Sequence, residues 1–103
     1  MSLSNHYFCF FRPVLSIETI SYLTFEGIRA FEELELAVRD ASNDVNPKMR
    51  RMHLLVTAIY ESIQALEAYS KFTHLSEANK EYLNKVRRAV STMECNYFVY
   101  LYT

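Results

Sequence analysis

Three stretches of the chain place apolar residues at alternating steps of three and four, and this spacing constrains the fold more than any other feature. It puts the side chains along one side of an α-helix, and its repetition over several turns describes a seam for a neighbouring helix. The three seams are Ile17, Ile20, Thr24, Gly27, Phe31, Leu34, Val38 and Ala41; Met49, Met52, Val56, Ile59, Ile63 and Leu66; and Leu83, Val86, Val90, Met93, Tyr97 and Tyr100. The sequence therefore predicts an all-α protein.

The predicted helices span about residues 16–42, 47–72 and 76–101, with short connections between them. Short connections force neighbouring helices to run antiparallel. The predicted architecture is an up-down-up antiparallel three-helix bundle, which we expect dimerisation to complete. We expect the 103 residues to form a single helical domain, with residues 1–15 as an N-terminal aromatic arm.

Side chains at the predicted helix starts can satisfy free backbone N–H groups. Ser16 and Ser76 are the expected N-caps of the first and third helices. In the second helix, Asn46 is the expected N-cap and Pro47 the first helical residue, where a missing N–H does no harm. Gly27 lies in mid-helix, where glycine costs about 1 kcal/mol relative to alanine. We therefore expect either a close neighbouring backbone or bulky side chain at Gly27, or a kink.

Two aromatic segments lie near the ends of the chain. Residues 6–11 have the composition of a strand. Residues 96–102 continue the third seam, although their composition would suit a strand equally well, and we prefer a helix. If both segments were strands, their pairing could bring Cys9 near Cys95.

Composition excludes several classes of function. The net charge is −1, with 11 basic and 12 acidic residues, which gives no global attraction to nucleic acid or to an anionic membrane. A single glycine cannot build a phosphate-cradling loop. Two cysteines are too few for a disulfide scaffold, and no apolar run is long enough to span a bilayer. We expect a cytoplasmic location with reduced thiols.

No catalytic or metal-binding set stands out, so we expect no enzyme activity, no metal and no cofactor. The Glu-x-x-His pairs that a di-iron bundle needs do not occur. Cys9 and Cys95 sit among Tyr and Phe, where a thiol behaves as a small hydrophobe. Arg29 and Glu61 could face each other across the first two helices, but one pair is not a converging set of catalytic groups.

The helices also carry apolar residues away from the seams, which is consistent with the 50% hydrophobic content of the chain. One interpretation is that each stripe is wide because each helix touches two neighbours. The other is that a partner chain covers these residues, since large exposed apolar patches mark interfaces and two-fold dimers are the commonest assemblies. The predicted partner-binding residues are Phe25, Ile28, Leu36, Leu55, Tyr60, Tyr69, Phe72, Tyr82, Phe98 and Leu101.

Basic residues offer an alternative site. At the start of the second helix they oppose the helix dipole, so a phosphate or nucleic-acid contact could offset that cost. Ion pairing is the other explanation, because Arg50 and Arg51 fall opposite Asp40 and near Asp44 in an antiparallel hairpin. The candidate anion-binding residues are Lys48, Arg50, Arg51, His53, Arg87 and Arg88.

The predicted function is that of a small non-enzymatic protein–protein interaction module, an adaptor or regulator, acting as a homodimer. Tyr and Phe on the helix faces would anchor an unknown protein partner. The alternative is a regulator that binds nucleic acid or a phosphate ligand through the basic start of the second helix. No membrane contact is expected.

Overall fold

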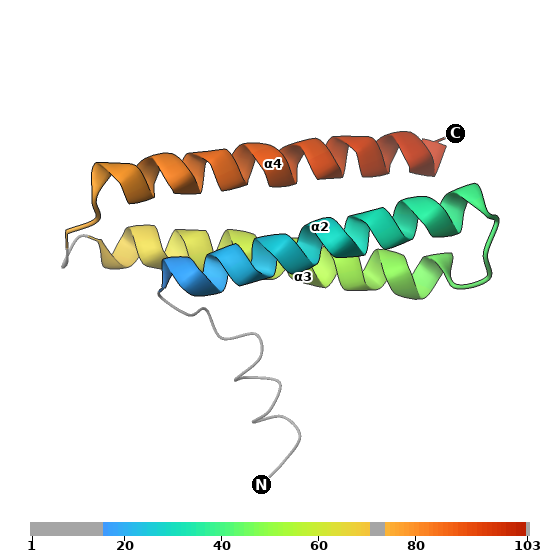
Figure 1. Cartoon of the computed structure of the whole chain (residues 1–103), viewed down its shortest axis with the longest axis horizontal. Helices are drawn as coiled ribbons and strands as arrows, with labels where there is room; N and C mark the ends of the chain where they lie inside the picture. The colour runs from blue at the N-terminus through green and yellow to red at the C-terminus, as the bar shows by residue number, and fades with distance from the viewer. Residues whose placement is uncertain (1–15, 71–73, 103) are drawn as a thin grey trace, which may run out of the picture.

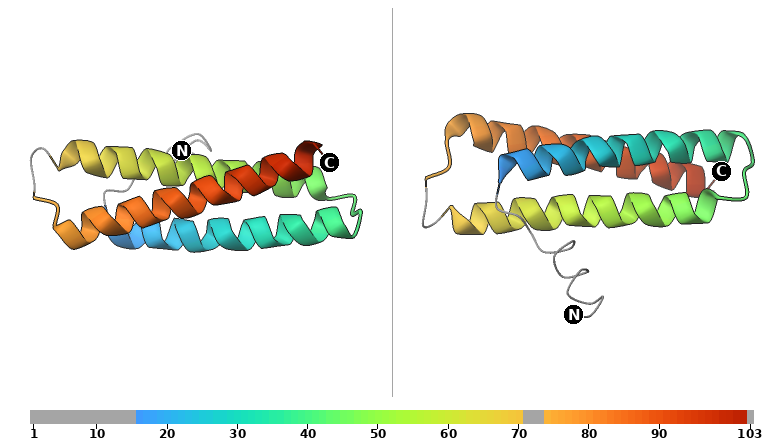
Figure 2. Two further views of the ribbon diagram at one scale, coloured as in Figure 1. Left: turned by 90° about the horizontal axis from the view of Figure 1, so that it is seen from above. Right: turned by 60° about the horizontal axis from the view of Figure 1, so that its bottom comes forward.

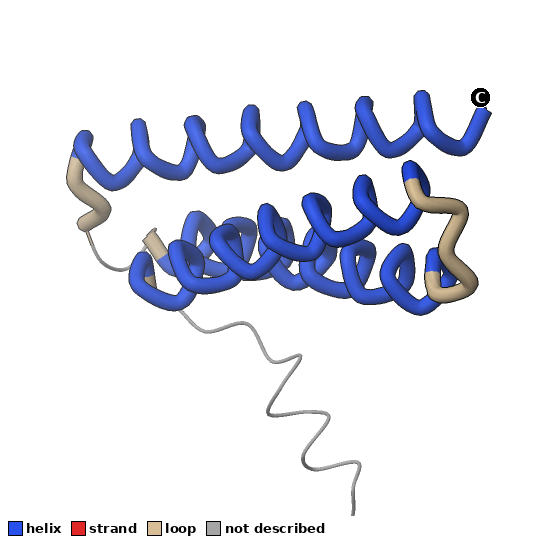
Figure 3. Tube along the Cα trace, turned by 45° about the vertical axis from the view of Figure 1, so that its right-hand side comes forward, coloured by secondary structure: helices blue, strands red, loops and turns tan. Residues whose placement is uncertain are grey.

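The computed structural model describes residues 16–70 and 74–102, and the side chains as far as Asn96. It contains α2 (Ile17–Arg39), α3 (Val45–Tyr69) and α4 (Glu77–Tyr102), and no strand occurs among these residues (Figure 3). The chain reverses direction at both connections (Figure 1). The predicted all-α, up-down-up antiparallel bundle is confirmed, as is the helix over residues 96–102. The expected strand at 6–11, with Cys9, lies outside the described residues.

The hairpin of α2 and α3 forms the base of the bundle, and α4 lies along it. Seen from above, α4 crosses obliquely over the groove between the two other helices (Figure 2). Among the described side chains of α4, the buried ones lie on one side, at Leu83, Val86, Val90 and Met93, which are residues of its predicted seam. A single apolar stripe is therefore enough to fix α4 on the hairpin.

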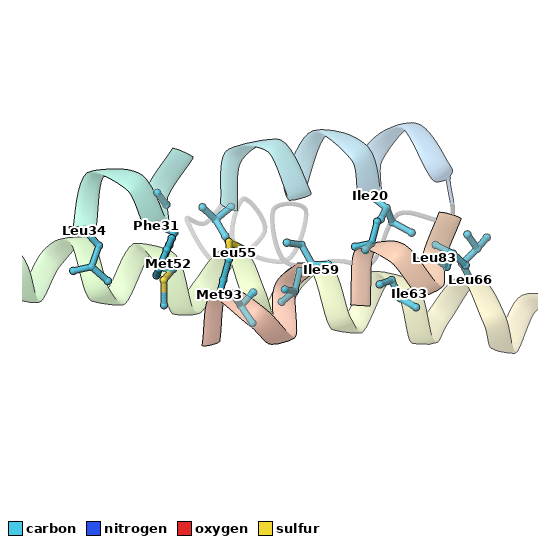
Figure 4. Close-up of a cluster of buried hydrophobic side chains, with 14 residues drawn as sticks. Ile20, Phe31, Leu34, Met52, Leu55, Ile59, Ile63, Leu66, Leu83 and Met93 are labelled. Carbon is cyan, nitrogen blue, oxygen red and sulfur yellow. The ribbon is translucent and has the colours of Figure 1, made fainter. Parts of the chain in front are cut away.

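The described residues of the three predicted seams form most of the core, which lies along the axis of the bundle (Figure 4), together with Ala30 and Leu55 beside the seams. Full burial of a Leu, Ile, Val or Met side chain contributes about 1.5–3 kcal/mol to stability. The most deeply buried large side chains of the core come from all three helices: Ile20, Leu34, Met52, Ile59, Ile63, Leu83 and Val90. Ala41 does not join the core, because it lies beyond the end of α2 and is exposed, and the side chains of Tyr97 and Tyr100 lie outside the described part of the chain.

Gly27 lies where all three helices meet. A Cβ atom built at this position would lie 3.4 Å from Ile59 Cδ1 on α3 and 3.9 Å from Met93 Cε on α4. The predicted close approach of a bulky side chain is confirmed, and α2 continues through Gly27 without interruption.

Two of the three predicted helix starts are confirmed. The Ser16 hydroxyl accepts a hydrogen bond of 3.1 Å from the backbone N–H of Thr19. The Ser76 hydroxyl accepts one of 3.1 Å from the N–H of Asn79. Each serine therefore satisfies one of the N–H groups that have no partner within the first turn of a helix.

The predicted start of the second helix is wrong. The N-cap of α3 is Asp44, with no side-chain cap hydrogen bond, and the helix begins at Val45. Asn46 and Pro47 therefore lie inside the first turn. Proline is tolerated there because the first N–H groups of a helix have no intrahelical acceptor.

A non-glycine residue in the left-handed conformation ends α2 three residues before the predicted end. Ala41 has a φ of 52°. The N–H of Ser42 donates to the carbonyl of Ala37 at 2.9 Å, and the N–H of Ala41 donates to that of Val38 at 3.2 Å. These two bonds form a Schellman motif, whose left-handed position usually holds glycine.

We predict that Ala41→Gly stabilises the protein by about 1 kcal/mol, because glycine adopts the left-handed conformation without the penalty of a Cβ atom. The matched control is Ala89→Gly at an exposed position within α4, which should destabilise the protein by about 1 kcal/mol. Urea unfolding followed by circular dichroism measures both effects. A loss of stability in Ala41→Gly would contradict the assigned helix end.

We predict that Gly27→Ala is tolerated and raises stability by up to about 1 kcal/mol, since 3.4 Å is an ordinary contact and alanine favours the helix. Gly27→Leu should instead lower stability by about 1–3 kcal/mol, because the longer side chain overpacks the space beside Ile59 and Met93. Thermal unfolding of the two variants checks both signs. Equal effects would show that Gly27 is not at a crowded contact.

Candidate protein-binding surface

The largest group of exposed apolar side chains in the described part of the chain lies on α2. Tyr22 is 63% exposed, Phe25 58%, Leu36 51% and Ile28 40%. Three exposed charged residues, Arg29, Glu32 and Arg39, lie among them. We call this surface the outer face of α2, and it consists of Tyr22, Phe25, Ile28, Arg29, Glu32, Leu36 and Arg39.

The outer face arises from a second periodic stripe. Residues 22, 25, 29, 32, 36 and 39 follow one another at alternating steps of three and four, like the seam but on the opposite side of the helix. A helix at the edge of a bundle needs only one apolar stripe, with polar residues on its other side. The apolar residues of the second stripe do not serve the core of this chain.

The charged side chains of the outer face make few and weak contacts with other described residues of the chain. The guanidinium of Arg29 lies 5.9 Å from the ring centroid of Phe25, and its Nη1 lies 3.6 Å from Oε2 of Glu26. Glu26 also accepts a hydrogen bond of 3.1 Å from Arg51 on α3. Glu32 and Arg39 form no ion pair with other residues that the structure describes. Exposed ion pairs contribute little, so Arg29 can exchange its partner at a small cost.

The structure brings together three of the predicted partner-binding residues, Phe25, Ile28 and Leu36. Leu55 lies in the core, because α3 faces two neighbouring helices, and it is not available to a partner. Tyr69 is exposed near the end of α3. Phe72 lies outside the described residues, as do the side chains of Phe98 and Leu101.

The predicted residues Tyr60 and Tyr82 are partly buried and attach α4 to the hairpin. The Tyr60 hydroxyl donates to Oε1 of Glu94 at 3.1 Å, and the Tyr82 hydroxyl lies 2.6 Å from the Ser21 hydroxyl. Both tyrosines pack against the core. They therefore stabilise the packing of α4 on the hairpin. Tyr22, by contrast, was not among the predicted residues, although its place three residues before Phe25 on the second stripe was the signal for it.

Burial, together with the hydrogen bond to Glu94 and the charge of that residue, raises the pKa of Tyr60 above its ordinary value. Tyrosines in the unfolded chain lose their protons near pH 10. Above that pH the folded state retains a proton that the unfolded state has released. The stabilising contribution is therefore complete below about pH 10 and declines as the pH rises further.

We predict that Tyr60→Phe reduces the loss of stability above about pH 10, because the variant has no proton to release at this site. Glu94→Gln should reduce it in part, since it removes the negative charge but keeps a hydrogen-bond acceptor. Urea unfolding between about pH 8 and about pH 11 measures this loss of stability, which should be largest in the wild type, smaller in Glu94→Gln and smallest in Tyr60→Phe. Identical alkaline profiles would contradict the role of this pair.

Acidic residues within the bundle engage several candidate anion-binding residues. Lys48 Nζ lies 3.2 Å from Oδ2 of Asp44 and 4.0 Å from Oε1 of Glu33. A hydrogen bond from the Ser42 hydroxyl, and then the contact with Lys48, lower the pKa of Asp44. Lys48 lines a small hollow of about 250 Å³ together with three carboxylates, which would repel a phosphate.

The other basic residues are distributed over separate surfaces. Arg51 pairs with Glu26, and Arg87 pairs with Glu67. Arg88 is exposed on α4. An open hollow of about 510 Å³ lies on the outer side of α3, and its described lining residues are Arg50, His53, Leu54, Thr57 and Glu61. The structure thus does not gather the six candidates into one basic surface.

The structure does not bring together the residues that the sequence offers for catalysis or metal binding. Arg29 pairs with Glu26 on its own helix, whereas Glu61 lies on the outer side of α3. The described residues contain no group of three His, Cys, Asp or Glu that could hold a metal ion. Cys95 is exposed on α4. None of the helices, over the residues that were described, has the length and apolar content needed to cross a membrane.

The fold and its surface define a small antiparallel three-helix bundle with one apolar helix face open to solvent. The chain is 45% identical over 80 residues, 78% of its length, to a segment of Protein timeless from Drosophila melanogaster. It is 43% identical over 74 residues, 72% of its length, to Protein timeless from Drosophila hydei. The chain spans only 6% and 11% of these two curated relatives. No protein-family model and no solved structure matches the chain.

Proposed function

We propose that this chain is a small, non-enzymatic protein–protein interaction module with a regulatory or adaptor role, which acts as a homodimer. The observation that carries the proposal is the outer face of α2, where four large apolar side chains are between 40% and 63% exposed. Burial of exposed aromatic and aliphatic anchors supplies most of the energy of protein recognition. The bundle holds these anchors in a row on a rigid helix, which lowers the entropic cost of binding.

The similarity to short segments of two much longer proteins supports this proposal. A segment of this size can act as one binding surface within a long protein. An exposed apolar helix face, such as the outer face of α2, is a binding surface of this kind. In this chain the same face can recognise a second copy or a helix of another protein. The cytoplasmic location expected from the sequence is part of this proposal.

The alternative, binding of a phosphate ligand or nucleic acid, has less support. Lys48, Arg51 and Arg87 are each paired with an acidic residue of the same chain. A salt titration distinguishes the two functions, because phosphate binding weakens steeply as salt rises whereas apolar association does not.

We predict that light scattering over a range of concentrations shows a rise from the 12.2 kDa monomer to twice that mass. The variant Phe25→Ser/Leu36→Ser should stay monomeric, because it removes the two anchors, and it should unfold at nearly the wild-type temperature, because both are exposed. The matched control is Leu54→Ser, an exposed leucine on α3, which should dimerise like the wild type. A wild-type protein that stays monomeric at high concentration would exclude the homodimer.

A further inference from the structure

We infer that two copies of the chain pair through antiparallel α2 helices, so that Arg29 of each copy faces Glu32 of the other. This inference rests on the proposed function, because it specifies how the homodimer forms. It concerns the orientation and register of the contact, which can be tested separately from self-association.

The first argument is the spacing of the outer face. From residue 22 to residue 39 the steps are three, four, three, four and three, a series that reads the same in both directions. A two-fold dimer needs such a surface, because residue i contacts residue j while j contacts i. With the two-fold axis midway between residues 29 and 32, position 22 faces 39, position 25 faces 36, and position 29 faces 32.

The second argument is the chemistry of the pairs that this register creates. Phe25 faces Leu36 of the second copy, so that two of the exposed apolar anchors become covered. Arg29 faces Glu32, which joins opposite charges at the centre of the contact. Tyr22 faces Arg39, whose guanidinium can stack on the ring. Each contact occurs twice because of the symmetry.

Charge also selects the direction of pairing. Parallel α2 helices in register would place Arg29 against Arg29 and Glu32 against Glu32. Like charges placed against each other at an interface oppose association. The antiparallel arrangement replaces both repulsions with two attractions, so the surface is complementary to itself in only one of the two directions.

The charged groups are available for these contacts. Glu32 and Arg39 have no ion-pair partner among the described residues, and both are exposed. Arg29 is 56% exposed, and the Glu26 that holds it at 3.6 Å is also held by Arg51. Release of Arg29 therefore leaves Glu26 paired.

The described residues of the other helices offer a poorer surface to a second copy. On the outer side of α3, Leu54 is the one large exposed apolar residue among the described residues that line the hollow. The described exposed positions of α4 are polar or small, as at Asn84, Lys85, Arg88 and Ala89. A contact through one face of one helix is small, so we expect a dissociation constant on the order of micromolar.

Charge reversal tests the pairing by sedimentation equilibrium. Arg29→Glu brings two carboxylates together across the contact, and Glu32→Arg brings two guanidinium groups together. Each single variant should weaken the dimer at least about tenfold. The double variant Arg29→Glu/Glu32→Arg restores opposite charges in the same register. It should return the dissociation constant to within about threefold of the wild type, a difference of under about 1 kcal/mol.

The matched control is Glu61→Arg, an equal charge reversal on the outer side of α3, which should leave the dimer unchanged. Circular dichroism and the unfolding temperature confirm that each variant remains folded. A double variant as weak as the single variants would overturn the antiparallel register while self-association still stood. Wild-type dimers insensitive to both single reversals would do the same. A monomeric wild type would overturn both the register and the homodimer.

Discussion

Packing of the α2 seam against both other helices is the contact on which the rest of the structure depends. At Gly27 the side chains of Ile59 and Met93 come from two different helices and lie 3.4 and 3.9 Å from the place that a Cβ atom would take. The space therefore admits alanine, but a longer side chain would overpack the contact between the three helices.

Because burial uses one side of α2, the fold places no demand for apolar residues on the opposite side. The described exposed positions of α4 follow this expectation and are mainly polar. The outer face of α2 departs from it, with Tyr22, Phe25 and Leu36 all more than half exposed. Exposed apolar area of this extent is unfavourable in water unless another surface covers it. The proposed function follows from that contrast between two helices of the same bundle.

Polar contacts have a different role in this molecule. The Tyr60–Glu94 and Ser21–Tyr82 pairs lie at the edges of the core and connect α4 to both helices of the hairpin. Directional bonds of this kind favour one register of a helix that apolar packing alone would hold less specifically. The ion pairs of Lys48, Arg51 and Arg87 lie on the surface and neutralise basic residues at the start of the second helix and within the third.

Sequence alone determined the three helices, their seams and the serine caps, because each of these depends on residues within a few turns of one another. The glycine at position 27 predicted a close neighbour, but only the tertiary structure shows that the neighbours are Ile59 and Met93. Tertiary structure decided which residues beside the seams are covered. Leu55 and Tyr60 pack inward while Tyr22 remains exposed, although all three are large and lie off the seam of their helix. Their exposure depends on where the second neighbouring helix crosses, and local periodicity does not specify a crossing angle. For the same reason, only the assembled bundle shows which carboxylate each basic side chain reaches, and that, among the described residues, the complete unburied stripe lies on α2.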